Sequence, residues 1–191
     1  MIARAAYELI REKKINRIYT GADTDDFKMS NLPEIVRDRA CKLFSDPMAG
    51  CIDKNPIQGV YYFLYFLEVE GYDLGIVTSR PKPLHEPTRY IVHRDFKNIN
   101  FNLGIHFANN ADNCDLANTS TKLELLKELK PDVYFDDYLP YCDEAVKAGA
   151  LISYLIQNKH TGWNKKATST DDIKTIKNVS HVDWRDYGCQ D

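Results

Sequence analysis

Two adjacent aspartates, Asp136 and Asp137, directly follow the short apolar run Val133-Tyr134-Phe135. A buried strand of an α/β sheet delivers such polar residues to the edge where ligands bind. Neighbouring carboxylates repel each other, so both stay ionised most easily beside a cation or hydrogen-bond donors. Carboxylate oxygens suit Mg²⁺, which usually takes one or two of them together with phosphate and water. An exposed acidic turn is the alternative for this pair.

A second polar group follows another apolar segment. Residues 72–77 are predicted to form a strand, and Thr78, Ser79 and Arg80 come directly after it. A hydroxyl group and backbone N–H groups at the end of a strand can hold phosphate oxygens. An ordinary turn at the end of a strand explains the same residues equally well.

An anion-binding role is also open to one lysine. Lys122 lies in the first turn of a helix predicted over residues 119–130. A cation is unfavourable at the N-terminus of a helix because the helix dipole is positive there. Lys122 is therefore a candidate for binding an anion, and a solvated surface lysine is the alternative.

The elements that must position these residues alternate along the chain. The expected helices cover residues 1–14, 33–44, 60–69, 86–95, 119–130 and 141–148, and the expected strands cover residues 72–77, 104–107, 133–135 and 151–156. Such alternation favours a parallel sheet flanked by helices. The aromatic helix over 60–69 is expected to pack in the core. The polar tail after residue 158 is expected to dock through a few apolar side chains.

Composition excludes several classes of protein. The chain has 191 residues, of which 43% are hydrophobic and 28% charged, as expected for one folded domain with room for a small insertion. A net charge of −3 gives no electrostatic case for a nucleic-acid polymer or an anionic membrane as partner. The five scattered cysteines form no CxxC pair, so we expect reduced thiols and a cytoplasmic location. The sequence does not predict an oligomeric state.

Together these segments resemble the haloacid dehalogenase (HAD) superfamily of phosphohydrolases, and within it the small 5′(3′)-deoxyribonucleotidase and nucleotidase-like branch. Thr78 in GIVTSR stands where the second motif of the family places its phosphate-binding hydroxyl. Lys122 in STKLELLKELKP stands where the third motif places its lysine. Asp136 and Asp137 in VYFDD match the fourth motif, which implies that they are metal ligands. The resemblance covers about residues 1–163.

The resemblance implies both a fold and an activity. The fold would be a Rossmann-like, HAD-like parallel sheet flanked by helices, with a helical cap-like segment over 1–52 and a core over 53–191. The activity would be Mg²⁺-dependent hydrolysis of a small phosphomonoester, plausibly a nucleotide. Thr78, Lys122 and Asp136 would be the catalytic residues, and Ser79 and Arg80 would join Thr78 and Lys122 in binding the substrate.

The first motif of the family, an apolar strand ending in Asp-x-Asp with a nucleophilic first aspartate, is the part without a clear match. The only Asp-x-Asp before Thr78 is formed by Asp23 and Asp25, and the preceding INRIYTGA is too polar for a central strand. Either Asp23 serves as nucleophile, or the motif lies upstream of an internal start, or the nucleophile is lost. A chain without it would be a phosphate-ligand-binding or interaction protein.

The sheet is expected to respond to this gap in one of three ways. Residues 15–20 would enter the central position, or residues 73–77 would pair directly with residues 132–135, or a partner chain would fill the space. We expect the central strand to be absent, because residues 15–22 fit the cap better. An unrelated nucleotide-binding domain is less favoured, because the sequence has no glycine-rich phosphate loop.

Overall fold

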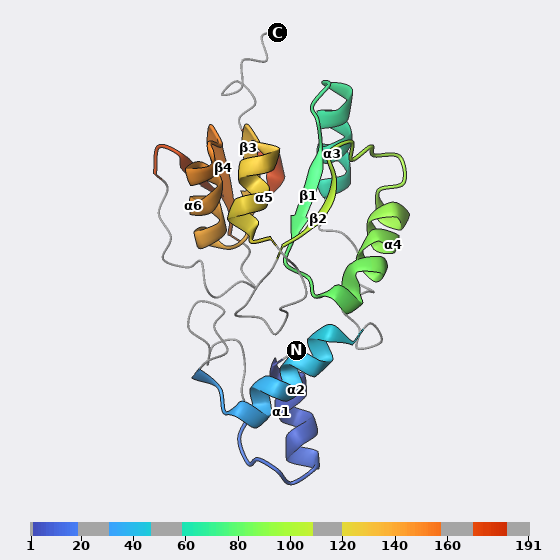
Figure 1. Ribbon diagram of the computed structural model, residues 1–191, viewed down its shortest axis with the longest axis vertical. Helices are drawn as coiled ribbons and strands as arrows, with labels where there is room; N and C mark the ends of the chain where they lie inside the picture. The colour runs from blue at the N-terminus through green and yellow to red at the C-terminus, as the bar shows by residue number, and fades with distance from the viewer. Residues whose placement is uncertain (1, 19–30, 47–58, 109–119, 158–169, 183–191) are drawn as a thin grey trace. The chain divides into compact units, whose positions relative to one another are not determined.

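The structure is a computed structural model that describes residues 2–18, 31–46, 59–108, 120–157 and 170–182 (Figure 1). The fold is mixed α/β, as the sequence predicted, and small parallel sheets are flanked by helices. The chain divides into two compact units. Unit 1 comprises Met1–Asn55 and Asp73–Leu125, and unit 2 comprises Pro56–Tyr72 and Leu126–Asp191. The predicted division into a cap over 1–52 and a core over 53–191 stays a prediction.

Unit 1 begins with a pair of packed helices, α1 (Ile2–Arg11) and α2 (Glu34–Ser45). Apolar residues recur at helical spacing on both helices, so each helix buries one stripe against the other. The buried apolar residues of these two helices are Ala5, Ala6, Leu9, Val36, Ala40 and Leu43, and Leu32 just before α2 packs with Leu9 and Val36.

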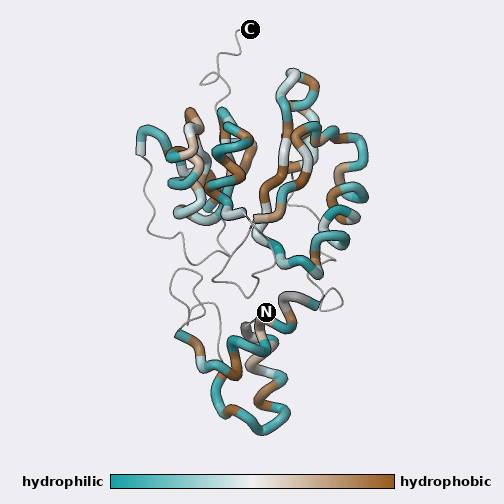
Figure 2. The backbone as a smooth tube through the Cα atoms, in the orientation of Figure 1, coloured by the Kyte–Doolittle hydropathy of each residue, from teal (hydrophilic) through white to brown (hydrophobic). Residues whose placement is uncertain are grey.

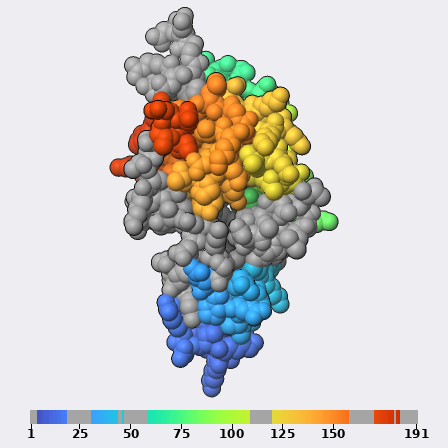
Figure 3. All heavy atoms as spheres, turned by 60° about the vertical axis from the view of Figure 1, so that its left-hand side comes forward, coloured from blue at the N-terminus to red at the C-terminus, as the bar shows by residue number. Residues whose placement is uncertain are grey.

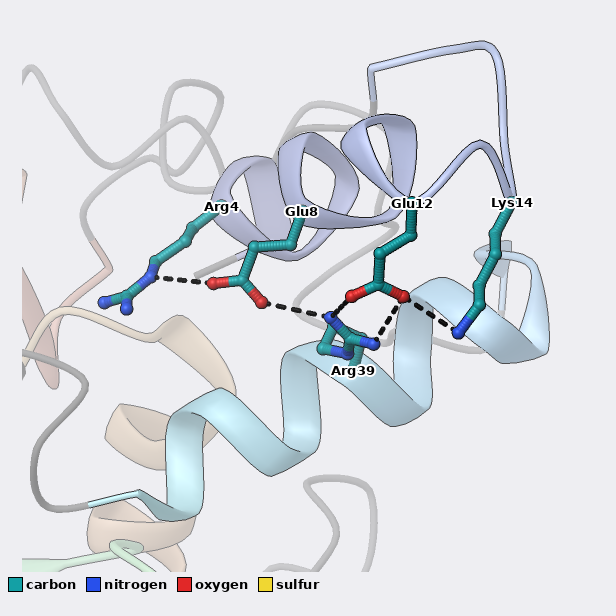
Figure 4. A network of polar contacts seen from close by, with 5 residues as sticks. All are labelled: Arg4, Glu8, Glu12, Lys14 and Arg39. Carbon is teal, nitrogen blue, oxygen red and sulfur yellow. Dashed lines mark hydrogen bonds and ion pairs between the residues drawn. The ribbon is translucent and has the colours of Figure 1, made fainter.

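Ion pairs connect the polar edges of these two helices (Figure 4). The guanidinium of Arg39 on α2 donates from both terminal nitrogens to the Glu12 carboxylate, at 2.8 and 3.0 Å, and also to Glu8 Oε2 at 3.2 Å. Lys14 Nζ lies 2.8 Å from Glu12 Oε2. These hydrogen bonds, Arg39 first and Lys14 second, lower the pKa of Glu12 to about 2.

The sheet of unit 1 has two parallel strands, β1 (Gly75–Thr78) and β2 (Gly104–Phe107). A 3₁₀ turn, η4 (Lys82–Leu84), and helix α4 (His85–Asp95) connect them. Strand β1 starts three residues later than the predicted Tyr72, because the backbone N–H of Leu74 donates to the side chain of Asn102, at 2.8 Å, instead of to a neighbouring strand.

Unit 2 contains a sheet of three parallel strands in the order β3-β4-β5, formed by β3 (Val133–Asp136), β4 (Ile152–Ile156) and β5 (Ile173–Ile176). The sequence predicted β3 and β4 but not β5, whose residues were expected only to dock. In the space-filling view the red atoms of the β5 segment lie beside the orange atoms of β4 and α6 (Figure 3). Strand β4 is central and its residues 152–155 are buried.

Helices cover both faces of this sheet. Helix α6 (Leu139–Ala148) packs Cys142 against Leu155 and Ile173 on one face, with Leu139 and Val146 around them. On the other face, α3 (Val60–Val69) places Phe63 edge-on against Phe135, with ring centroids 5.3 Å apart. Phe135 in turn stacks on Tyr154, at 5.0 Å. Figure 2 shows the hydrophobic residues gathered along the strands, while α4 of unit 1 is largely hydrophilic.

The aromatic residues of α3 are less buried than predicted. Leu67 is buried and Phe63 is half-buried in the core of unit 2, but Tyr62, Tyr65 and Phe66 are exposed, Tyr62 by 76%. Only one face of α3 packs on the sheet, and an aromatic residue at every position therefore leaves several of them in solvent. The predicted core packing therefore holds for one face of α3 only.

Helix α5 (Lys122–Leu129) begins at a capping box. The N–H of Glu124 donates to Thr121 Oγ1 at 3.2 Å, and the N–H of Thr121 donates to Glu124 Oε2 at 2.7 Å. A second 3₁₀ turn, η7 (Val179–His181), follows β5. None of the described helices is long and apolar enough to cross a membrane.

In the part of the chain that the structure describes, the strands form two sheets instead of the single predicted sheet. Among the described residues, β1 and β3 belong to different sheets, so the expected direct pairing of 73–77 with 132–135 is not formed there. The described part of the segment 15–20, residues 15–18, is not in a strand either. The expectation that the central strand is absent stays a prediction.

One cysteine departs from the prediction of reduced thiols. Cys41 on α2 is disulfide-bonded, and its partner cysteine lies outside the described residues. Cys142 on α6 is a buried free thiol, as predicted. Disulfides persist mainly in oxidising compartments. The predicted cytoplasmic location therefore loses the support that scattered, unpaired cysteines gave it.

Candidate functional site

The predicted phosphate-binding hydroxyl lies at the carboxyl end of β1. Thr78 is the last residue of that strand and is paired in register with Phe107, the last residue of β2. Its carbonyl oxygen accepts a hydrogen bond from Ala108 N at 2.8 Å, which extends the ladder one residue past the strand. Thr78 and the following Ser79 are half-buried. This is the sheet edge where ligands of parallel α/β sheets bind.

Arg80, which follows directly, points to helix α4. Its Nη1 donates a hydrogen bond to Thr88 Oγ1 at 3.1 Å. The Thr88 hydroxyl in turn donates to the backbone oxygen of Leu84, at 2.6 Å. Thr88 is 5% exposed and did not stand out in the sequence. A threonine in the first turns of the helix that follows TSRP is the signal that would have indicated it.

A second basic group lies at the start of the same helix. His85 stacks on the ring of Phe107, with centroids 3.7 Å apart and 21° between the planes. Arg89, one turn further along α4, places its guanidinium carbon 4.9 Å from the centre of the same ring. Arg89 also pairs with Glu86 at 2.8 Å, so its charge is partly balanced.

Lys122 lies in the first turn of α5, as predicted, although the helix begins at this residue and not at position 119, and it is 6% exposed. Burial of an ammonium group is costly unless it is paired or hydrogen-bonded. A solvated surface lysine, the alternative from the sequence, does not describe this residue. Glu124 in the same first turn is exposed and engaged in the capping box with Thr121.

Asp136 is the last residue of β3 and its carboxylate is held by two donors. The Tyr134 hydroxyl donates to Oδ2 at 2.7 Å, and the Tyr138 N–H donates to Oδ1 at 2.9 Å. Burial, and then the charge of Asp136, raise the pKa of Tyr134, so the phenol stays a proton donor. Tyr134 was not predicted, although its position two residues before Asp136 places both on one strand face. Tyr138 N closes an Asx turn that leads into α6.

These residues fit a Mg²⁺ ion with few protein ligands. A carboxylate accepts about four hydrogen bonds, so the two donors do not by themselves exhaust Asp136. Asp137 is exposed beside it. No group of three or more His, Cys, Asp or Glu side chains converges within the part of the chain that is described. Mg²⁺ commonly binds through one or two carboxylates and completes its shell with water and phosphate.

The predicted site residues fall into two halves. Thr78, Ser79, Arg80 and Lys122 belong to unit 1, whereas Asp136 and Asp137 belong to unit 2. Each half keeps its residues at the carboxyl end of a parallel strand or in the first turn of a helix. The meeting of the two halves in one site stays a prediction. Asp23 and Asp25 lie outside the described residues.

No protein-family model, curated protein or solved structure matches this chain.

Proposed function

We propose that this chain is a HAD-like, Mg²⁺-dependent phosphomonoesterase that acts on a nucleotide or a similar small phosphate ester. The observation that carries the proposal is the position of three motif residues. Thr78 ends β1, Asp136 ends β3, and the buried Lys122 begins α5. Strand ends and helix N-termini of parallel α/β proteins are where phosphates and their metal ions bind.

In this proposal the residues divide the work of phosphoryl transfer. The Thr78 hydroxyl and the Lys122 ammonium bind the phosphoryl oxygens and balance their charge. Asp136, fixed in orientation by Tyr134 and Tyr138, holds the metal ion with support from Asp137. A bound Mg²⁺ would supply further neutralisation of the phosphoryl charge. The Rossmann-like core and the helical cap belong to the same proposal.

The alternative is a relative that binds a phosphate ligand without hydrolysing it. It is favoured by the division of the sheet, because β1 and β3 are in different sheets and residues 15–18 are not in a strand. In the family, the strand that bears the nucleophile would pair with β1 and β3, and residues 15–18 would begin it. The site residues named above would then bind the ligand, and the aspartyl nucleophile would be missing.

The metal half of the proposal is tested by Asp136→Asn. Loss of the negative charge at β3 should lower Mg²⁺ affinity at least about tenfold, because a carboxylate–cation contact is replaced by a neutral amide. Calorimetric titration with MgCl₂ measures it. Asp132→Asn is the matched control, since Asp132 is an exposed aspartate just before the opposite end of the same strand. Equal Mg²⁺ affinity in the wild type and Asp136→Asn would contradict the assignment.

Turnover separates the two candidate functions. The phosphomonoesterase predicts release of phosphate from a nucleoside monophosphate that depends on Mg²⁺ and is lost in Asp136→Asn. Loss in Asp23→Asn as well would identify Asp23 as the nucleophile. Phosphate binding with no turnover by the full chain would leave the non-hydrolytic alternative.

A further inference from the structure

Among the described residues, Arg80 is held by a neutral hydroxyl and not by a carboxylate. The residue is half-buried at the end of β1, yet within the described part of the chain its one hydrogen-bond partner is a neutral hydroxyl. Removing a guanidinium from water without a carboxylate partner is unfavourable. With no carboxylate paired to it among the described residues, this guanidinium is available to another anion.

Thr88 fixes where that charge is presented. Its hydroxyl proton is donated to the Leu84 carbonyl at 2.6 Å, so a lone pair of the oxygen faces Arg80 Nη1 at 3.1 Å. Thr88 is 5% exposed, so water competes little for either hydrogen bond. A guanidinium has five N–H donors in a rigid planar fork. Anchoring one of them orients the remaining four.

The backbone around Arg80 is restrained as well. Pro81 follows it, is among the most fully buried residues, and restricts Arg80 to extended conformations. The N-terminus of α4 adds a positive partial charge beside the guanidinium. The acidic residue in that first turn, Glu86, has a side chain that is 85% exposed and is paired with Arg89 at 2.8 Å.

We propose that Arg80 and Thr88 form a phosphate-binding arm beside Thr78. Arg80 contacts the anion with its planar fork, which matches two oxygens of a phosphate, and Thr88 is the positioning residue that orients it. The ligand is a phosphate dianion, free or carried by a phosphomonoester. The phosphomonoester arm of this inference rests on the proposed function, whereas binding of free phosphate does not.

Inorganic phosphate and a nucleoside monophosphate are the two probes, titrated calorimetrically into the full chain. Arg80→Gln should lower the affinity for both at least about tenfold, as expected for a lost charge-assisted hydrogen bond. Thr88→Val keeps the shape of the side chain but removes the hydroxyl, and should lower affinity about fivefold, the effect of one lost hydrogen bond that only positions the arginine. Thr88→Ser should restore affinity to within about twofold.

The matched control is Arg94→Gln at the other end of α4, where Arg94 pairs with Asp95 at 2.6 Å. This variant should not change the affinity for phosphate. Unfolding midpoints show whether each variant is folded. If Thr88→Val is not, the ¹⁵Nε resonance of Arg80 decides, since it must shift on addition of phosphate in the wild type and in Thr88→Ser.

Three results would overturn the arm. They are phosphate binding unchanged in Arg80→Gln, equal losses in folded Thr88→Val and Thr88→Ser, and an Arg80 resonance that phosphate does not move. If phosphate binding requires Arg80 but no substrate is hydrolysed, the phosphomonoesterase proposal is rejected and the phosphate-binding arm is retained. If hydrolysis is unchanged in Arg80→Gln, the phosphate-binding arm is rejected and the phosphomonoesterase proposal is retained.

Discussion

The two sheets of this protein differ in how completely their strands are covered. In unit 2, the central strand β4 is buried along residues 152–155, with α6 on one face and the Phe63 side of α3 on the other. In unit 1, the strands β1 and β2 are half-buried apart from the exposed Gly75, and the helix that connects them is largely polar. Two-stranded sheets are marginal by themselves.

The difference separates a structural region from a region suited to binding. The apolar sheet of unit 2 gains stability from contacts that need no partner molecule. The sheet of unit 1 instead ends in Thr78, Ser79 and a half-buried arginine with a neutral partner. Regions of lower local stability commonly supply binding loops.

The largest effect on stability is expected for Tyr154→Ala on β4. Tyr154 is 1% exposed and stacks on Phe135, so its truncation should lower the free energy of unfolding of unit 2 by about 3–5 kcal/mol. Val77→Ala on half-buried β1 should cost only about 1 kcal/mol. Native-state hydrogen exchange measures both. Amides of β1 and β2 as strongly protected as those of β4 would break the comparison.

A smaller effect is expected at the disulfide of Cys41. Cys41→Ser should lower the free energy of unfolding by about 2–4 kcal/mol, because a disulfide restricts the unfolded chain. Urea unfolding with and without a reducing agent measures the change. The reducing agent should destabilise the wild type and have no further effect on Cys41→Ser. Non-reducing peptide mapping that finds Cys41 as a free thiol would refute this prediction.

The smallest expected effect is a loss of stability of the α1–α2 pair at low pH. The pKa of Glu12 is lowered from 4.5 to about 2 by Arg39 and then Lys14, so this contribution is complete above about pH 4.5 and is lost as the pH falls towards 2. The α1–α2 pair should loosen in that window, and less so at high salt. NMR titration of Leu9 and Val36, against Leu155 and Ile173 in unit 2, measures the difference.

Arg39→Met is the variant that isolates this effect. It should flatten the acid transition of α1 and α2 below pH 4.5, since it removes the largest cause of the lowered pKa of Glu12 in the folded state. Arg37→Met is the control on the same helix. Arg37 pairs with Asp38 and not with Glu8 or Glu12, so the variant should leave the transition unchanged. An identical titration in both variants would show that the Arg39 pairs do not couple to helix packing.

Periodicity was sufficient to predict most of the secondary structure. Helix α3 and strand β2 have the predicted bounds, because glycine ends one and begins the other. Helix α6 starts at Leu139, two residues before the prediction, since Pro140 is well tolerated in a first turn. Strand β5 was missed because its IKTI sequence alternates within a polar tail and is recognisable only beside β4.

The candidate site was predictable in position but not in its supporting contacts. Motif spacing placed Thr78, Lys122 and Asp136 at strand ends and in a first turn, where the structure has them. Tyr134 and Thr88 act through hydrogen bonds made by folding, and neither belongs to a motif. The disulfide of Cys41 was also invisible, because connectivity between scattered cysteines is not encoded in their spacing.

The place of β5 in the sheet limits where this chain can be shortened. Its backbone groups pair with β4, from Ser153 with Ile173 to Ile156 with Ile176. A protein trimmed after Gln157 would turn the most buried strand into an edge, with apolar residues and open N–H and C=O groups along it. Exposed edges of that kind recruit other chains. Expression of any shortened form should therefore keep at least residues 170–182, even though the motif residues all precede them.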